Sequence, residues 1–226
     1  MNMNMNIDYF DNKINFNGEH INVIEIENKK CFYRLVKDLY TMFLEGCVND
    51  ITFFEKDKGK NMNGKLKVFT NFFNFEFDSK KYTNDISKYV SGNIAEKEKN
   101  ILLSLYNKII KTYTKILNNI DLPLNVENEV TIENITKFIK VSIDNSNELL
   151  DSLFLLIDLE STLLTNNILF FVNLKQYLST TELIELYKYA IYKEIEIVLI
   201  DSQSYGVTLK YEKKYIIDEN LDEFVL

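Results

Sequence analysis

Hydrophobic and polar positions along the chain predict α/β segments at both ends, with a helical segment between them. Residues 21–26 have the pattern of a buried strand, in which β-branched residues alternate with polar ones. From Lys29 the apolar spacing changes to that of a helix, and Gly46 supplies a stop. Residues 50–57 and 65–73 are typical of further short strands. A small sheet is therefore expected near the start of the chain.

The middle of the chain has the pattern of long amphipathic helices. Apolar residues trace one face over residues 94–120, with lysine and glutamate on the other. A short helix capped by Thr131 follows, and a second long helix begins at Ser146 or Asn147. These two long helices, running out and back, are expected to form a helical arm.

The last third of the chain returns to an α/β pattern. Residues 167–173 form an apolar strand, and residues 195–201 form the next one. Between them, Ser179 and Glu182 have the capping-box spacing that begins a helix. A strand, a helix and a strand in this order predict parallel neighbours in one sheet.

These patterns predict an α/β fold with an inserted helical segment. We expect an α/β head domain assembled from residues 1–83 and 166–226, and a helical arm over residues 84–165. The sequence contains no internal repeat and no flexible linker.

Composition limits the classes of protein that fit. The 226 residues carry a net charge of -8, which argues against a generally basic nucleic-acid coat but leaves room for lysines gathered on one face. The two cysteines, Cys31 and Cys47, lack the spacing of a zinc or redox site, so we expect reduced core thiols. No signal peptide or membrane-spanning stretch is predicted, and a cytoplasmic location is expected.

Enzymatic chemistry has weak support in the residues themselves. Phosphate-binding loops need glycines, because the backbone must approach the phosphates closely, and "IENKKC" at residues 26–31 has none. Asn173 ends a strand, where a buried amide is more often structural. The single histidine, His20, is best interpreted as a surface or capping residue. Asp201 and Ser202 end a parallel strand where α/β active sites gather, but they are equally typical of a turn.

The order of motifs gives a more specific hypothesis. The end of the chain, "ILFFVNLKQYLSTTELIELYKYAIYKEIEIVLIDSQSYG" followed by "KYIIDENLDEF", resembles the Csn2 family, the ring-forming DNA-end-binding proteins of type II-A CRISPR systems. The start, "MNMNIDYFDNKINFNGEHINVIEIENKKCFYRLVKDLY", looks like that family's short strand pair, first core strand and first helix. The blocks "ITFFEKDKGK" and "VTIENITKFIKVSID" follow in the same order, so the resemblance covers nearly the whole chain.

The resemblance implies a fold and a function. The head is expected to be similar to a P-loop-type α/β fold without a functional phosphate loop. The protein is expected to be a non-enzymatic homotetrameric ring. The ends of double-stranded DNA are expected to thread through this ring, and the binding is expected to be independent of DNA sequence. Its implied role is spacer acquisition in antiviral immunity, alongside the CRISPR integrase and the RNA-guided nuclease of the same system.

A ring that accepts any duplex must contact the DNA backbone with lysines. The resemblance implies six of them: Lys29, Lys30, Lys56, Lys58, Lys60 and Lys137. Lys137 matches the family pattern best. Lys56, Lys58 and Lys60 lie in the loop after "ITFFE". For each of these three taken singly, a solvated lysine on an Asn/Lys-rich surface is an equally good interpretation.

The family also implies calcium ions that support the ring. Calcium prefers several oxygen ligands, and the acidic stretch between the arm helices makes Glu127 and Glu129 the leading ligands, followed by Asp121 and Glu133. Asn125 and Asn128 stand where relatives often have a denser run of acidic residues, so we expect calcium binding to be weaker or dispensable. The alternative to a calcium site is that these acidic residues simply suit the positive end of the helix dipole at a helix N-terminus.

Assembly requires apolar surface beyond the core of the monomer. The segment "NFFNFEF" at residues 71–77 places aromatic residues on both faces of an expected short strand. Either both faces of that strand are buried within the monomer, or one face meets another subunit. Two further hypotheses stay open beside the ring: an atypical nucleotide-dependent enzyme on the same head, and a protein–protein adaptor without DNA binding.

Overall fold

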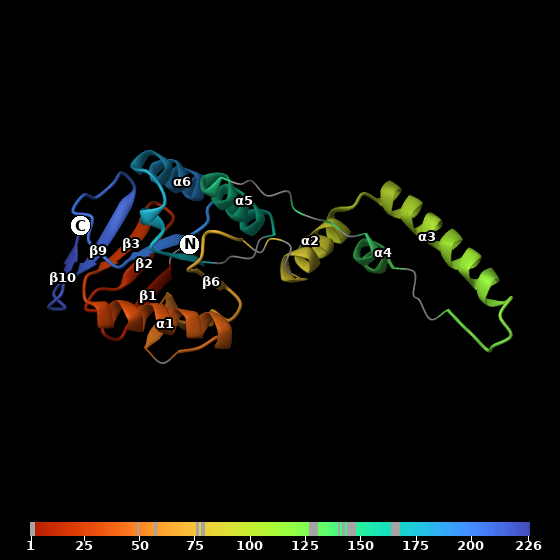
Figure 1. The fold of residues 1–226 in the computed structure, drawn as a ribbon, viewed down its shortest axis with the longest axis horizontal. Coiled ribbons are helices and arrows are strands. Elements are labelled where there is room, and N and C mark those ends of the chain that lie inside the picture. The colour runs from red at the N-terminus through yellow and green to blue at the C-terminus, as the bar shows by residue number, and fades with distance from the viewer. Residues whose placement is uncertain are drawn as a thin grey trace. The chain divides into compact units, whose positions relative to one another are not determined.

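The computed structural model describes residues 3–48, 50–56, 58–75, 77, 80–126, 131–139, 141, 143, 148–163 and 168–226. Figure 1 shows the order of the elements along the chain. The strands are β1 (Met3–Ile7), β2 (Ile14–Phe16), β3 (Ile21–Ile26), β4 (Ile51–Glu55), β5 (Lys58–Gly59), β6 (Leu66–Phe69), β7 (Ile168–Val172), β8 (Ile197–Asp201), β9 (Glu212–Ile217) and β10 (Glu223–Val225). The helices are α1 (Lys29–Glu45), α2 (Lys80–Asn93), α3 (Glu96–Leu117), α4 (Ile132–Phe138), α5 (Leu149–Thr162) and α6 (Thr180–Tyr192), with a 3-10 turn η1 (Leu174–Gln176).

The described strands form two sheets. The larger has the order β10-β9-β3-β8-β7-β6, in which all neighbours are parallel except the antiparallel pair of β9 and β10. The smaller is antiparallel, with the order β2-β1-β4-β5. All six residues of β3 are buried, as are all five of β7 and of β8, because both faces of the larger sheet are covered.

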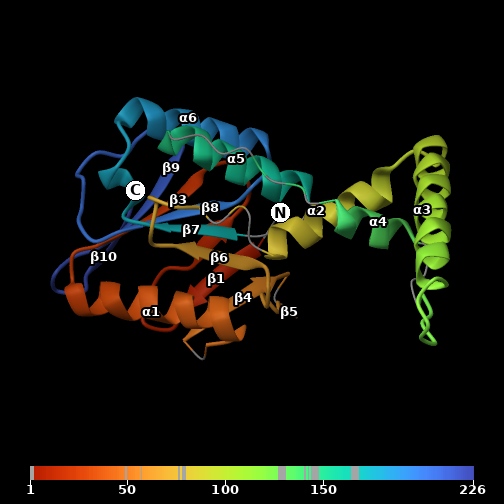
Figure 2. The same cartoon turned by 45° about the vertical axis from the view of Figure 1, so that its right-hand side comes forward.

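The α/β unit is layered. Helix α1 and the small sheet cover one face of the larger sheet, and α5 and α6 cover the other (Figure 2). Met3, Met5 and Phe53 from the small sheet join Leu35 and Leu39 of α1 in one hydrophobic cluster with the larger sheet. No helix among the described residues is long and apolar enough to cross a lipid bilayer.

Local signals predicted the ends of several helices correctly. Gly46 ends α1 in the left-handed conformation, with a φ of 83° that suits glycine. Ser179 and Glu182 form a complete capping box at the start of α6. Thr131 caps α4 and accepts a hydrogen bond from the backbone of Asn134. Helix α5 begins a little later than predicted, with Glu148 at its cap position.

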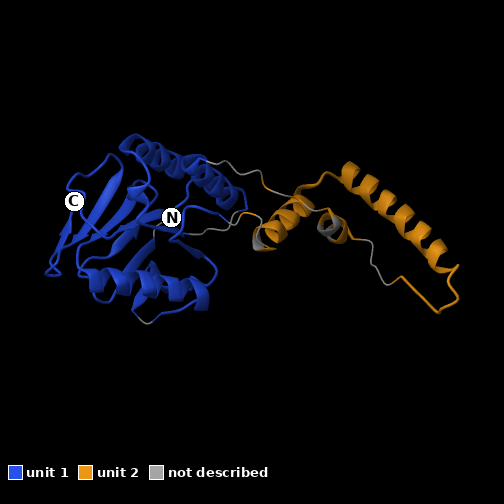
Figure 3. Ribbon diagram, viewed as in Figure 1, with its two compact units in different colours: residues 1–75, 146–226 blue, residues 76–145 orange. Residues whose placement is uncertain are grey.

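The chain divides into two compact units, coloured separately in Figure 3. Unit 1 comprises residues 1–75 and 146–226, and unit 2 comprises residues 76–145. The predicted arm, residues 84–165, differs from unit 2 at both ends, and most at the far end, where α5 lies in unit 1. Helix α5 belongs to unit 1 because it packs on α6, where the Tyr189 hydroxyl donates to Asp158 at 2.8 Å and the ring of Phe154 lies 4.5 Å from that of Tyr189.

Unit 2 is built from α2, α3 and α4. The hydroxyls of Ser91 in α2 and Thr136 in α4 lie 3.0 Å apart. Helix α3 has no buried residue, although its apolar positions follow the predicted pattern.

The predicted aromatic strand is wrong beyond Phe69, where β6 ends. Phe72 and Phe75 are buried instead in a ring cluster with Phe69, Phe171 and Tyr177. Phe73 is 85% exposed and contacts only the edge of Tyr177 among the aromatic rings of the described residues. The aromatic side chains thus complete the end of the larger sheet without a strand.

Candidate nucleic-acid interface

The junction between β3 and α1 is closed by the chain itself. The side-chain oxygen of Asn28 accepts hydrogen bonds from the backbone N–H groups of Lys30 and Cys31, both at 3.1 Å. Its amide nitrogen donates to the carbonyl of Glu219 at 2.9 Å. The N–H groups that bind phosphate at other helix N-termini are therefore occupied by a side chain of this helix's own cap.

Lys29 and Lys30 are exposed at this junction. Lys30 lines a shallow pocket of about 280 Å³ with Tyr9, Arg34 and other residues. The guanidinium of Arg34 lies over the ring of Tyr9 and is 2.7 Å from the carboxylate of Asp50. Arg34 therefore holds the start of the chain against α1, whereas the two lysines point their charge at solvent.

The other three lysines predicted in unit 1 lie at the opposite end of α1. Lys56, Lys58 and Lys60 belong to the β4–β5 hairpin, which lines a pocket with Met42 and Gly46 from the last turn of α1 (Figure 2). A helix of 17 residues is about 25 Å long, so the two lysine groups are well separated within one chain. Lys60 is also paired with Glu55 at 2.8 Å. The structure therefore does not bring the predicted lysines into one patch on unit 1.

Asn173 ties the ends of two strands together. It has a left-handed backbone, with a φ of 59°, and its side-chain oxygen accepts from the backbone N–H of Ser202 at 2.9 Å. Its own backbone N–H donates to Ile200 at 2.7 Å. This amide is structural, as the sequence favoured.

A buried network of charges lies on the sheet face that α6 covers. The Glu25 carboxylate binds the ammonium groups of Lys214, at 2.9 Å, and Lys175, at 3.3 Å. Lys175 also pairs with Glu212 at 2.8 Å, and the Tyr187 hydroxyl donates to Glu212 at 2.8 Å. The side chains of the four charged residues are at most 4% exposed. Such a network stabilises one packing of the sheet and is closed to a substrate.

Asp201 lies beside this network without joining it. It pairs in register with Glu25 on the neighbouring strand, and both of its carboxylate oxygens are buried with no hydrogen-bond partner in the described residues. Burial raises the pKa of Asp201 to about 7, against the opposing effect of Lys175. Asp201 therefore holds its proton up to neutral pH.

His20 differs from the surface or capping histidine that the sequence favoured. Its side chain is half-buried just before β3, and its Nε2 atom is buried without a hydrogen-bond partner in the described residues. Burial and the charge of Lys213 lower the pKa of His20. Cys31 and Cys47 are free, as expected, although Cys47 is exposed and so is not a core thiol.

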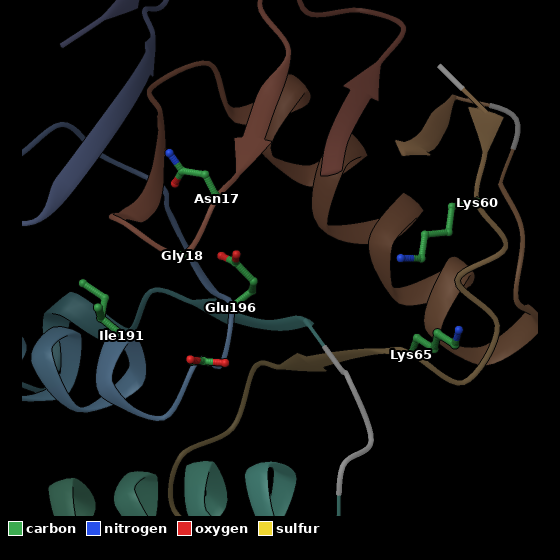
Figure 4. A pocket seen from close by; sticks show the side chains of 7 residues that line it. Asn17, Gly18, Lys60, Lys65, Ile191 and Glu196 are labelled. Atoms are coloured by element: carbon green, nitrogen blue, oxygen red, sulfur yellow. The ribbon is translucent and has the colours of Figure 1, made fainter. Parts of the chain in front are cut away.

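A larger pocket, of about 600 Å³, lies at the amino-terminal ends of the parallel strands (Figure 4). Lys60 and Lys65 line it on one side and Glu196 on the other, and Glu194 is also among the lining residues. Glu196 precedes β8, and burial raises its pKa. Ligands of open α/β sheets bind at the carboxyl ends of the strands. This mixed-charge pocket lies at the opposite edge of the sheet, so it does not correspond to that usual ligand site.

The predicted sites in unit 2 are only partly described. Lys137 and Glu133 are residues of α4 whose side chains lie outside the description, and Glu127 and Glu129 lie outside the described residues altogether. Asp121 is exposed in the turn after α3. Among the described residues, no group of three or more His, Cys, Asp or Glu could hold a metal ion.

Comparison with protein families relates this architecture to known proteins. The family model "CRISPR-associated protein (Cas_Csn2)" matches residues 47–221, which is more than half of the chain. The chain belongs to the Csn2 family of CRISPR-associated proteins. The family predicted from the order of the motifs is thereby confirmed. A search of curated protein sequences found no match.

Solved structures add a likeness of fold to the Csn2 family match. The crystal structure of Stu0660 of Streptococcus thermophilus aligns with a TM-score of 0.62 and 14% identity, and covers 100% of this chain and 76% of that one. At this identity the likeness shows a shared fold alone. A nucleotide-free ATP-binding cassette from an ABC transporter covers 99% of this chain and 91% of its own, at 9% identity, but its TM-score of 0.41 carries no argument.

Sequence reasoning about this Csn2 family member missed the buried network. Glu25, Lys175, Glu212 and Lys214 were not singled out, because β3 (INVIEI) and β9 (EKKYII) each contain more than one polar residue. A strand in which polar and apolar residues alternate usually turns its polar side to solvent, so only the packing of both sheet faces shows that these charges are buried and must be paired.

Proposed function

We propose that this Csn2 family member is a non-enzymatic protein that binds the ends of double-stranded DNA without regard to sequence. It assembles as a homotetrameric ring that threads duplex DNA, and takes part in CRISPR spacer acquisition with the integrase and the RNA-guided nuclease of the same system. Membership of the family is the observation that carries this proposal.

The β3–α1 junction supports a function without nucleotide hydrolysis. The side chain of Asn28 fills the helix N-terminus, and no glycine lies between Gly18 and Gly46 to let the backbone surround a phosphate. The exposed charges of Lys29 and Lys30 stay available for phosphates of a DNA backbone, which needs charge rather than a cradle of N–H groups.

Calcium is part of the proposal as a structural ion. The carboxylates of Asp121, Glu127, Glu129 and Glu133 belong to the donor type that calcium prefers. A bound ion would supply positive charge that holds these acidic residues together between α3 and α4.

Binding of linear duplexes by the full chain tests the proposed function. Two blunt duplexes of unrelated sequence are titrated at increasing salt, and nucleotide hydrolysis is measured in parallel. Equal affinities that fall steeply with salt, without hydrolysis, support the proposal. Absence of binding at low salt would favour the protein–protein adaptor, and saturable nucleotide turnover would favour the enzyme.

A further inference from the structure

The outward side of α1 carries lysines and tyrosines at helical spacing, so that they share one face. We define the α1 outer face by the residues that share this side of the helix: Lys29, Lys30, Tyr33, Lys37, Tyr40 and Leu44. All six are exposed, and they recur at spacings of three and four residues, opposite the fully buried Leu35 and Leu39. Helix α1 lies on the outside of unit 1, so this face is open within the unit (Figure 2).

The charge of this face is positive, although the chain as a whole is acidic. Lys29, Lys30 and Lys37 form no ion pair in the described part of the chain, in contrast to Lys60, which is paired with Glu55. The acids of the helix lie elsewhere. Asp38 accepts a hydrogen bond from Tyr9 at 3.1 Å, and Glu45 is the last residue of the helix.

Large exposed side chains accompany these lysines. Tyr33 is 67% exposed and Tyr40 is 46% exposed, which is far from the burial that an aromatic ring usually reaches. Neither hydroxyl forms a hydrogen bond within the described residues, so each can donate to an acceptor on a partner. The face therefore combines point charges with hydroxyl donors and contains no acidic side chain.

We propose that the α1 outer face contacts the phosphate backbone of duplex DNA, with Lys37 and the hydroxyls of Tyr33 and Tyr40 as contacts beyond Lys29 and Lys30. This inference rests on the proposed function. Lysine and tyrosine are among the side chains that bind phosphates without reading the bases. Lys30 and Lys37 are two helical turns apart, about 11 Å, which corresponds to about three base pairs along a duplex.

Salt-dependent titration of a blunt linear duplex tests this inference. Lys37→Ala should weaken binding several-fold and lower the slope of log affinity against log salt by about one, because one phosphate contact is lost. Tyr33→Phe with Tyr40→Phe should weaken binding at every salt concentration and leave the slope unchanged, because it removes hydroxyls and no charge. Lys188→Ala, at an exposed lysine of α6, is the matched control and should bind as the wild type does.

The outcomes separate this inference from the proposed function. If the wild type binds the duplex and both α1 variants bind equally well, the contact surface lies elsewhere and the inference is overturned, while the proposed function stands. If the wild type does not bind, both are overturned. If the variants bind DNA normally but light scattering shows that they lose their oligomeric state, the α1 outer face is a protein interface and the inference is overturned.

Discussion

The ammonium group of Lys214 lies 2.9 Å from a carboxylate oxygen of Glu25, and neither side chain is exposed to solvent. Lys214 also donates to the carbonyl of Val207 at 2.7 Å, and Glu25 accepts from the Ser204 hydroxyl at 3.0 Å. The interior of this α/β unit is thus held by paired charges as well as by apolar contacts. Removing one partner of such a pair should lower the free energy of unfolding, because a buried charge without its partner is costly.

Lys214→Met should destabilise the chain by about 3–5 kcal/mol, because it leaves Glu25 with one ammonium partner fewer in the interior. Urea unfolding measures the loss. Lys188→Met, at an exposed position of α6, should change stability by less than about 0.5 kcal/mol. Equal stability of the two variants would show that the network contributes nothing.

Asp201 should make stability depend on pH. Because burial raises its pKa to about 7, the folded state keeps a proton that the unfolded state releases above about pH 4. The free energy of unfolding should therefore fall as pH rises from about 4 to 7, by up to about 1.4 kcal/mol per pH unit, and stay at its lower level above 7.

Asp201→Asn isolates this effect, because an amide is neutral at every pH. The difference in stability between variant and wild type should grow in favour of the variant from pH 5 to pH 8, as measured by urea unfolding. His20 titrates in both proteins and cancels in the comparison. A difference that does not change with pH would mean that Asp201 is ionised throughout this range.

The cap of α1 should contribute measurably to stability. Asn28→Ala removes the acceptor for the N–H groups of Lys30 and Cys31, at a cost of about 1 kcal/mol in denaturant unfolding. Asn28→Asp keeps the acceptor and should retain most of that stability. If both variants are equally destabilised, the bond from the Asn28 amide to the Glu219 carbonyl is the more important one.

Charge reversal of three predicted lysines should separate DNA binding from assembly. Replacing Lys29, Lys30 and Lys137 by Glu should abolish duplex binding in a mobility-shift titration, because each change adds repulsion from phosphates. The oligomer, measured by light scattering, should be unchanged. At the start of α1, glutamate also suits the helix dipole, so folding should be retained. Undiminished binding would show that these lysines do not face the DNA.

Local features of the fold could be predicted from the sequence because they depend on neighbours in the chain. Gly46 ends α1 through its own backbone conformation, and Ser179 and Glu182 cap α6 within a few residues. The apolar strands β7 and β8 were equally clear, since their continuous hydrophobic runs match strands that are covered on both faces.

Long-range packing could not be predicted in the same way. The amphipathic pattern of α5 shows that it has a buried face, but the pattern is the same whether that face meets α6 or another helix of an arm. Likewise, the pairing of β1 with β4 joins segments more than 40 residues apart and leaves no local signal.

The sequence could predict which lysines are candidates for DNA contact, but not which of them share one surface. Lys30 and Lys60 are similar lysines in the sequence, yet the first is free of ion pairs in the described residues and the second is paired with Glu55 at the far end of α1. The contribution of Lys37 depends on sharing a helix face with Lys30, a relation that emerges once the opposite face is known to be buried.

The comparison of linear with covalently closed circular duplex of the same sequence tests the central claim most directly. A mobility-shift titration of the full chain is made on both forms, with and without calcium and at two salt concentrations. The ring predicts salt-sensitive binding of the linear form alone, because a closed circle offers no end to thread. Equal binding of circles would contradict threading and indicate an open basic surface.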